Sequence, residues 1–265
     1  MAVIFQAGYS LPGGDEPLTH ARIAHANNWL AGGTVNASST ATGYFAEGPA
    51  NSLTYEKWKP SAPGTWEYDH GGASECDYCA IGAHTFGTDS ATFKVQYWNG
   101  GAWVDLCAAQ SPADDEPIMV IFAPQTRQRW RVNISAGTPE IGVVKFGKAL
   151  QMERAFFGGH APLNLARQTV LRSNLSETGE FLGRTKQRTY LASSFGWEHL
   201  TAAWVRTNWP TLQTAIETEP FFVAWRPGDY PDVGLVQVDS LDAPQNMGIR
   251  DLMQASLTVR GYGYG

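Results

Sequence analysis

The sequence predicts a mainly β protein in two parts, with one helical element in the second part. Aromatic residues make up 12% of the 265 residues, with ten Trp and 28 Gly, a composition that favours strands and turns over long helices. Apolar and polar residues alternate with a period of two in several segments, and only residues 196–219 show helical spacing. The length suits two modest domains of ~100–150 residues each.

The first part, from about residue 34 to 150, reads as short antiparallel strands. In "ATFKVQYWNGGAWVDL" (91–106), apolar and polar residues alternate up to the hairpin turn Asn99-Gly100-Gly101, after which the chain returns. "RQRWRVNI" (127–134) alternates in the same way, and "IGVVKFGKAL" (141–150) is a less polar strand. Several half-buried strands without a strong helix between them predict an antiparallel sandwich or barrel.

The second part follows the Gly- and Pro-containing segment "RAFFGGHAPLN" (154–164), so we expect domains at 1–154 and 155–265. Residues 167–192 read as two strands around a turn, and strands return at 220–227, 233–241 and 251–263. Within the helical stretch, Pro210 is expected in the first turn of a second helix, where its missing N–H costs nothing. The pattern is α+β, a helical element against an antiparallel sheet or split barrel. The apolar start "AVIFQAGY" can add a strand to either domain.

The charge and hydropathy patterns exclude several classes of protein. A net charge of −6 without a basic stripe argues against nucleic-acid specificity. No segment approaches the ~18 consecutive apolar residues of a membrane helix, so no membrane insertion is expected. The first residues lack the pattern of a signal peptide, and three cysteines give no disulfide framework, which predicts folding in a reducing cytoplasm.

The Cys76-x-x-Cys79 pair is the clearest chemical motif, and three readings stay open. The two thiols can be structural, they can hold a metal together with His70 or His84, or they can form a redox pair. A structural zinc site needs four ligands, usually from two such pairs, and a redox pair expects a βαβ context. Neither context is visible, so structural cysteines are favoured.

No enzyme class finds support in the sequence. Asp69 and His70 lie near Glu67 and Glu75, but catalytic carboxylates need fixed separations on rigid elements, and a Gly-rich stretch favours solvated loop charges. A GxSxG elbow, a P-loop, HExxH and GxGxxG are all missing from the sequence. The three arginines at 127, 129 and 131 form a basic strand face that can bind an acidic sugar or simply face solvent.

The order of motifs from about residue 20 to 153 resembles the discoidin (F5/8 type C, galactose-binding-like) family. The resemblance lies in "TVNASST" (34–40), "GPANSLTYEKWKP" (48–60), "GTWEYDHGG" (64–72), the hairpin at 91–106 and the strands "RWRVNI … IGVVKFGKAL". It implies an eight-stranded jelly-roll sandwich that often binds glycans through loops at one end. Some members carry a structural calcium held by loop carbonyls, and no other cofactor is implied. The family's terminal disulfide cysteines are missing here.

The second part is similar to C-terminal regions of tailed-bacteriophage tail-tip proteins. The motifs are "PFFVAWRPGDYPDVGLVQV" (220–238) and the last strand, ending in "SLTVRGYG" (256–263). The resemblance implies a tail-tube or distal-tail type of split barrel that stacks into a ring, as a hexamer or trimer. It also implies tail-tube, tape-measure and tail-hub proteins as partners, and a place in the virion after assembly in the host cytoplasm.

The leading hypothesis is therefore a non-enzymatic component of a phage tail tip or baseplate whose sandwich contacts host-surface glycan or braces its neighbours. The discoidin resemblance places Trp58 and Trp66 in the sandwich core. The candidates for ligand contact are Tyr55, Tyr68, His70, Trp98 and Arg129. One alternative is a soluble bacterial carbohydrate-binding protein with a dimerisation domain, and another is a fragment of a glycan-active enzyme.

Overall fold

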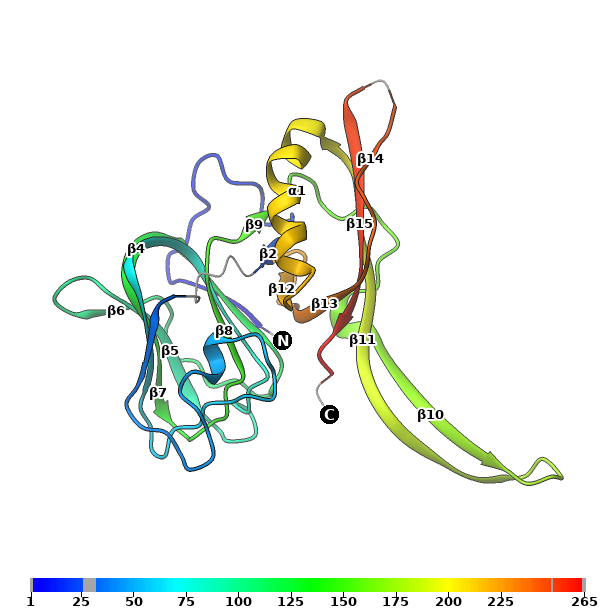
Figure 1. Ribbon diagram of the computed structural model, residues 1–265, viewed down its shortest axis with the longest axis horizontal. Helices are drawn as coiled ribbons and strands as arrows, with labels where there is room; N and C mark the ends of the chain where they lie inside the picture. The colour runs from blue at the N-terminus through cyan, green and yellow to red at the C-terminus, as the bar shows by residue number, and fades with distance from the viewer. Residues whose placement is uncertain (1, 26–31, 249, 264–265) are drawn as a thin grey trace.

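The computed structural model describes residues 2–25, 32–248 and 250–263, and it is mainly β, as expected. Its strands form two sheets, seen at the left and the right of Figure 1. Almost all neighbouring strands are antiparallel, and the described exception is β1, which runs parallel to β7. Among the described residues no helix is long and apolar enough to span a membrane.

The first sheet is the sandwich expected from the sequence, and two long strands organise it. Its strand order is β3-β4-β7-β5-β6, with β1 on β7 and β8 on β4. The bounds are β1 (Ala2–Phe5), β3 (Thr34–Ala37), β4 (Thr65–Gly82), β5 (Thr92–Trp98), β6 (Trp103–Asp105), β7 (Ile118–Ala136) and β8 (Val143–Gly147).

The strand β4 bends so that its two halves pair with different neighbours. Its first half pairs with β3 and its second half with β8, and register shifts interrupt its pairing with β7 between Asp69 and Ser74 and between Cys76 and Tyr78. Such bulges bend and twist a strand, which lets the sheet wrap around its own core. That core contains Trp58 and Trp66, both fully buried, as the discoidin resemblance implied.

The second sheet has the order β10-β11-β15-β13-β12-β2-β9, with β14 on β15. The bounds are β2 (Arg22–Ala24), β9 (Leu150–Gln151), β10 (Arg167–Leu175), β11 (Phe181–Thr201), β12 (Phe221–Ala224), β13 (Val233–Leu241), β14 (Gln245–Asn246) and β15 (Leu252–Gly261). Two short 3₁₀ turns, Gly48–Ala50 and Leu163–Leu165, complete the described elements together with one helix. The strands β2 and β9 precede residue 155 in sequence, yet they pair with the second sheet; the boundary between 154 and 155 stays a prediction.

The two sheets share an apolar interface. Buried side chains from β4, β7 and β8 pack against side chains from β2, β12 and β13, among them Tyr78, Ile121, Phe222 and Leu235. At Gly82 a Cβ would lie only 2.9 Å from Leu235 Cδ2 and 3.0 Å from Phe222 Cε1, so the backbone of β4 approaches the second sheet closely. The two parts are thereby held together by packing as well as by the chain.

The helical stretch differs from its prediction. A single helix, α1 (Ala202–Ile216), runs through Pro210, and residues 196–201 belong to β11. The expectation of a second helix beginning at Pro210 is therefore wrong. Trp209 and Leu212 are buried on one face of α1 in the core of the second sheet, and this packing outweighs the hydrogen bond that Pro210 removes. Trp197, which belongs to the stretch 196–219 expected to be helical, lies on β11.

A two-stranded arm projects from the second sheet. The pairing of β10 with β11 runs from Arg167↔Leu191 to Leu175↔Phe181, whereas β15 pairs with β11 only from Leu191 onward. Figure 1 shows the arm extending away from both sheets at the lower right. Residues 171–175 and 177–188 are all exposed.

Candidate functional site

The Trp98–Trp103 hairpin and the arginines of β7 form the candidate site on the outer face of the sandwich. In β7, Trp130 and Val132 point into the core, so the period of two places Arg129 and Arg131 on the opposite face. Trp98 of β5 pairs directly with Trp103 of β6, and their ring centroids are 5.4 Å apart at 60°. We call the surface formed by Trp98, Trp103, Arg129, Arg131 and Glu67 of β4 the Trp–Arg face.

The turn between the two tryptophans is built as the sequence indicated. Asn99 Oδ1 accepts hydrogen bonds from the backbone N–H groups of Gly101 at 2.9 Å and Ala102 at 2.8 Å, and Gly100 has φ of 102°. A positive φ is inexpensive for glycine, which fixes a tight turn here. The short hairpin therefore holds both indoles on one face of the sheet.

Guanidinium groups stack against the indoles of this face. The Arg129 Cζ atom lies 5.4 Å from the ring centroid of Trp98 and 5.4 Å from that of Trp103, and the Arg131 Cζ atom lies 4.1 Å from the centroid of Trp103. All three distances fall within the ~6 Å range of cation–π attraction. The stacking orders the long arginine side chains without removing their charge.

Polar partners fix the direction of both guanidinium groups. Arg129 Nε donates to Glu67 Oε1 at 2.7 Å, and Arg131 Nε donates to Gln96 Oε1 at 2.7 Å. Partial burial lowers the pKa of Arg131, although an arginine stays cationic at any physiological pH. The result is a preordered face of indole edges and N–H donors, which suits hydroxyl groups or a carboxylate on a sugar.

Two of the five predicted ligand residues, Trp98 and Arg129, lie on the Trp–Arg face, and the other three do not. Tyr55 is 74% exposed, but it lines a different groove of about 480 Å³ together with Arg260 and Tyr262. His70 lies on β4 with its ring centroid 6.2 Å from that of Tyr68. The ligand-binding role of these residues stays a prediction.

The expectation that Tyr68 lies exposed at the rim is wrong. Its side chain is completely buried in the sandwich core, and burial raises the pKa of its hydroxyl group. Trp66 and Tyr68 are two residues apart on one strand, so they share a face, and a core position for Trp66 implies one for Tyr68.

The acidic residues of β4 do not form an acid–base pair. Glu67 is engaged by Arg129, the Asp69 Oδ1 atom accepts from Gln128 Nε2 at 2.8 Å, and the Glu75 Oε2 atom lies 3.1 Å from Lys148 Nζ. Each carboxylate is thus paired with a different group along β4 rather than gathered around one reacting position. The predicted Gly-rich loop is a bulge within β4, where the register with β7 shifts between Asp69 and Ser74.

Cys76 and Cys79 lie fully buried on β4, in the same core as the tryptophans. Burial raises the pKa of both thiols, as it does for Cys107, which disfavours the thiolate that metal binding requires. Within the described ranges, no group of three or more His, Cys, Asp or Glu side chains is arranged to hold a metal ion.

Sequence reasoning missed Trp103 and Glu67 as parts of the Trp–Arg face. The hairpin itself carried a signal for Trp103, because a tight turn over residues 99–102 places the strand residues that flank it opposite each other. No local signal pointed to Glu67, which reaches Arg129 from a strand about sixty residues away.

No family model matches the chain, and no curated protein matches it. Among solved structures, it is similar to a chitosan-binding module of a chitosanase/glucanase from Paenibacillus sp. IK-5, at 15% identity and a TM-score of 0.38, over 47% of this chain and 99% of that one. A carbohydrate-binding module of a family 31 glycoside hydrolase from Clostridium perfringens matches at 8% identity and a TM-score of 0.39, over 46% and 98%. A fucosidase from Ruminococcus gnavus matches at 18% identity and a TM-score of 0.41, over 48% of this chain but only 28% of the fucosidase.

Proposed function

We propose that the protein is a non-enzymatic structural component of a bacteriophage tail tip or baseplate, which assembles with copies of itself into a ring and contacts host-surface glycan through the Trp–Arg face. The observation that carries the proposal is the exposed arm formed by β10 and β11. The similarity of residues 220–238 and 256–263 to tail-tip proteins supports the place in a virion, and the discoidin resemblance supports glycan as the ligand.

The arm has the properties of an assembly element. Four large apolar side chains near its tip are exposed: Phe181 at 81%, Leu182 at 67%, Leu175 at 57% and Leu171 at 47%. A hairpin of two strands is marginally stable by itself in water, and its two edges present unpaired backbone groups. Contact with another chain would cover the apolar side chains, which makes self-assembly the function that the arm suits best.

The assembly test uses light scattering on the full-length protein. The wild type should run as a trimer or hexamer, and the double variant Phe181→Ser with Leu182→Ser should run as a monomer. Phe45→Ser is the matched control, because Phe45 is 63% exposed on the sandwich, outside the arm. A wild type that stays monomeric at every concentration contradicts the proposal, and a strict dimer would favour a soluble carbohydrate-binding protein instead.

The glycan part of the proposal is tested separately on a glycan array. Trp98→Ala should remove binding, since it deletes one of the two indoles, whereas Tyr55→Ala should leave binding intact. Loss of binding in both variants, or in neither, contradicts the assignment to the Trp–Arg face. An antibody against the chain should label the tail tip of virions from a phage that carries this gene; labelled heads or unlabelled particles would refute the virion role.

A further inference from the structure

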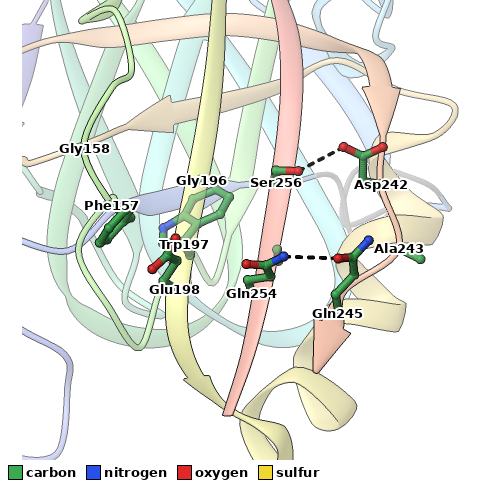
Figure 2. A pocket seen from close by; sticks show the side chains of 11 residues that line it. Phe157, Gly158, Gly196, Trp197, Glu198, Asp242, Ala243, Gln245, Gln254 and Ser256 are labelled. Atoms are coloured by element: carbon green, nitrogen blue, oxygen red, sulfur yellow. Dashed lines mark hydrogen bonds between the residues drawn. The ribbon is translucent and has the colours of Figure 1, made fainter. Parts of the chain in front are cut away.

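A groove on the second sheet is open, acidic and separate from the Trp–Arg face. Figure 2 shows it where β11, β15 and the segment leading to β14 meet. Its volume is about 310 Å³, and side chains that line it are Phe157, Glu198, Asp242, Gln245, Gln254 and Ser256. Phe157 supplies an apolar wall that is itself 54% exposed.

A glycine and a bulge create this groove. Gly196 lies on β11 opposite Ser256, and a Cβ added to it would meet no atom within 4 Å. Its φ lies outside the left-handed region, so neither packing nor backbone conformation requires a glycine there. Two residues farther, the register between β11 and β15 shifts between Trp197 and Leu200, so that the β11 residues Glu198 and His199 lie opposite Gln254.

The groove carries two carboxylates and no basic side chain among its lining residues. Asp242 Oδ2 accepts from Ser256 Oγ at 3.1 Å, and Gln254 Nε2 donates to Gln245 Oε1 at 3.1 Å. Within the described part of the chain no hydrogen bond or ion pair engages the carboxylate of Glu198. An occupant should therefore combine an apolar group for Phe157 with a cation for the acidic wall.

The arm offers that combination. Phe181 and Leu182 stand next to Arg184 and Lys186 on one exposed strand, and residues 167–188 hold five basic residues against two acidic ones. We propose that the arm tip of a second copy of this chain occupies the groove, with Phe181 or Leu182 against Phe157 and the basic side chains beside Glu198. This inference rests on the self-assembly proposed above and names its acceptor site.

The occupant must come from another copy because donor and acceptor lie on the same strand. Fifteen residues separate Phe181 from Gly196 along β11, and at ~3.3 Å per residue they span roughly 50 Å. The acceptor end of β11 is also hydrogen-bonded to β15, so the arm cannot fold back onto its own groove. Two different surfaces that join head to tail generate a ring when the rotation closes. Because the arm tip of one subunit reaches the groove of the next, equivalent atoms of neighbouring subunits should lie no more than roughly 50 Å apart.

Filling the groove tests the acceptor without touching the arm. Gly196→Val places a side chain in open space on a strand that favours β-branched residues, so folding should be preserved. We expect the assembly to dissociate, with an apparent Kd raised at least about tenfold. Gly72→Val is the matched control, since a Cβ at Gly72 also meets nothing within 4 Å and the residue lies on β4 of the sandwich.

Disulfide trapping gives a second readout that does not depend on dissociation. Chains carrying Leu182→Cys, mixed with chains carrying Gln245→Cys under oxidation, should form a linked heterodimer, because the three native cysteines are buried. Mixing Leu182→Cys with Phe45→Cys should not. If the arm variant dissociates while Gly196→Val stays assembled and no link forms at Gln245, the arm assembles copies through another surface and this inference is wrong. If the wild type is monomeric, the self-assembly itself is refuted.

Discussion

We expect the stability of the folded protein to depend on pH through Asp77. This carboxyl group lies on β4 beside the interface between the sheets, and its Oδ1 atom accepts from the backbone N–H of Ala149 at 2.8 Å. Burial raises its pKa from 3.8 to about 7, and the hydrogen bond from Ala149 and the charges of Lys148 and Arg22 only partly oppose this. A carboxyl group whose pKa is raised in the folded state stabilises the fold most below its unfolded pKa.

The expected change in the free energy of unfolding follows from the pKa shift of Asp77. Between about pH 3.8 and about pH 7, Asp77 keeps its proton in the folded protein but releases it in the unfolded chain. The stability that protonated Asp77 contributes is therefore lost as the pH rises through this window. A shift of about three units corresponds to roughly 4 kcal/mol. Asp77→Asn keeps an oxygen for the N–H of Ala149 and removes the charge. The free energy of unfolding of the variant should match that of the wild type near pH 4 and exceed it by several kcal/mol at pH 8.

The assay is urea unfolding at fixed pH, followed by tryptophan fluorescence, from pH 4 to pH 8. The difference between variant and wild type is needed because His84 acts in the opposite direction. Burial lowers the pKa of His84 from 6.5 to about 4, so its contribution is lost as the pH falls through the same window. Glu177→Gln, at the exposed tip of the arm, is the control. A difference for Asp77→Asn that stays constant across this range, or a variant less stable at pH 8, refutes the reasoning.

Three further predictions concern packing, the helix and the thiols. Gly82→Ala should destabilise the protein by about 1–3 kcal/mol in urea unfolding, because the new Cβ would press on Leu235 across the interface; an unchanged midpoint would show that β4 can move away. Pro210→Ala should raise the melting temperature, because the new backbone N–H can donate to the carbonyl of Arg206 inside α1. A lower melting temperature for the variant would mean that the proline ring packs favourably. The three buried cysteines should react with a thiol reagent only on unfolding, and rapid labelling of the native protein would contradict their burial.

The sequence was sufficient wherever a local rule decides the structure. The hairpin at Asn99-Gly100-Gly101 forms as predicted, because a turn with positive φ depends on the residues within it. Alternation along residues 127–134 correctly separated the buried Trp130 from the outward Arg129, since a strand has a period of two. The same rule applied to Trp66 and Tyr68 would have placed both rings in the core.

Tertiary structure decided everything that depends on partners distant in sequence. Alternation shows that a segment is a strand, but it does not say which sheet the strand joins, and the short strands β2 and β9 joined the second sheet. Packing of α1 carried the helix through Pro210 against its local preference. The Trp–Arg face and the acidic groove each gather residues from several strands, so neither leaves a continuous motif in the chain. Local rules in the sequence determined the mainly β class and the hairpin, and the discoidin resemblance placed Trp58 and Trp66 in the core. The two sites depend instead on the pairing of strands far apart in the chain, and the stability of that pairing comes from non-local contacts.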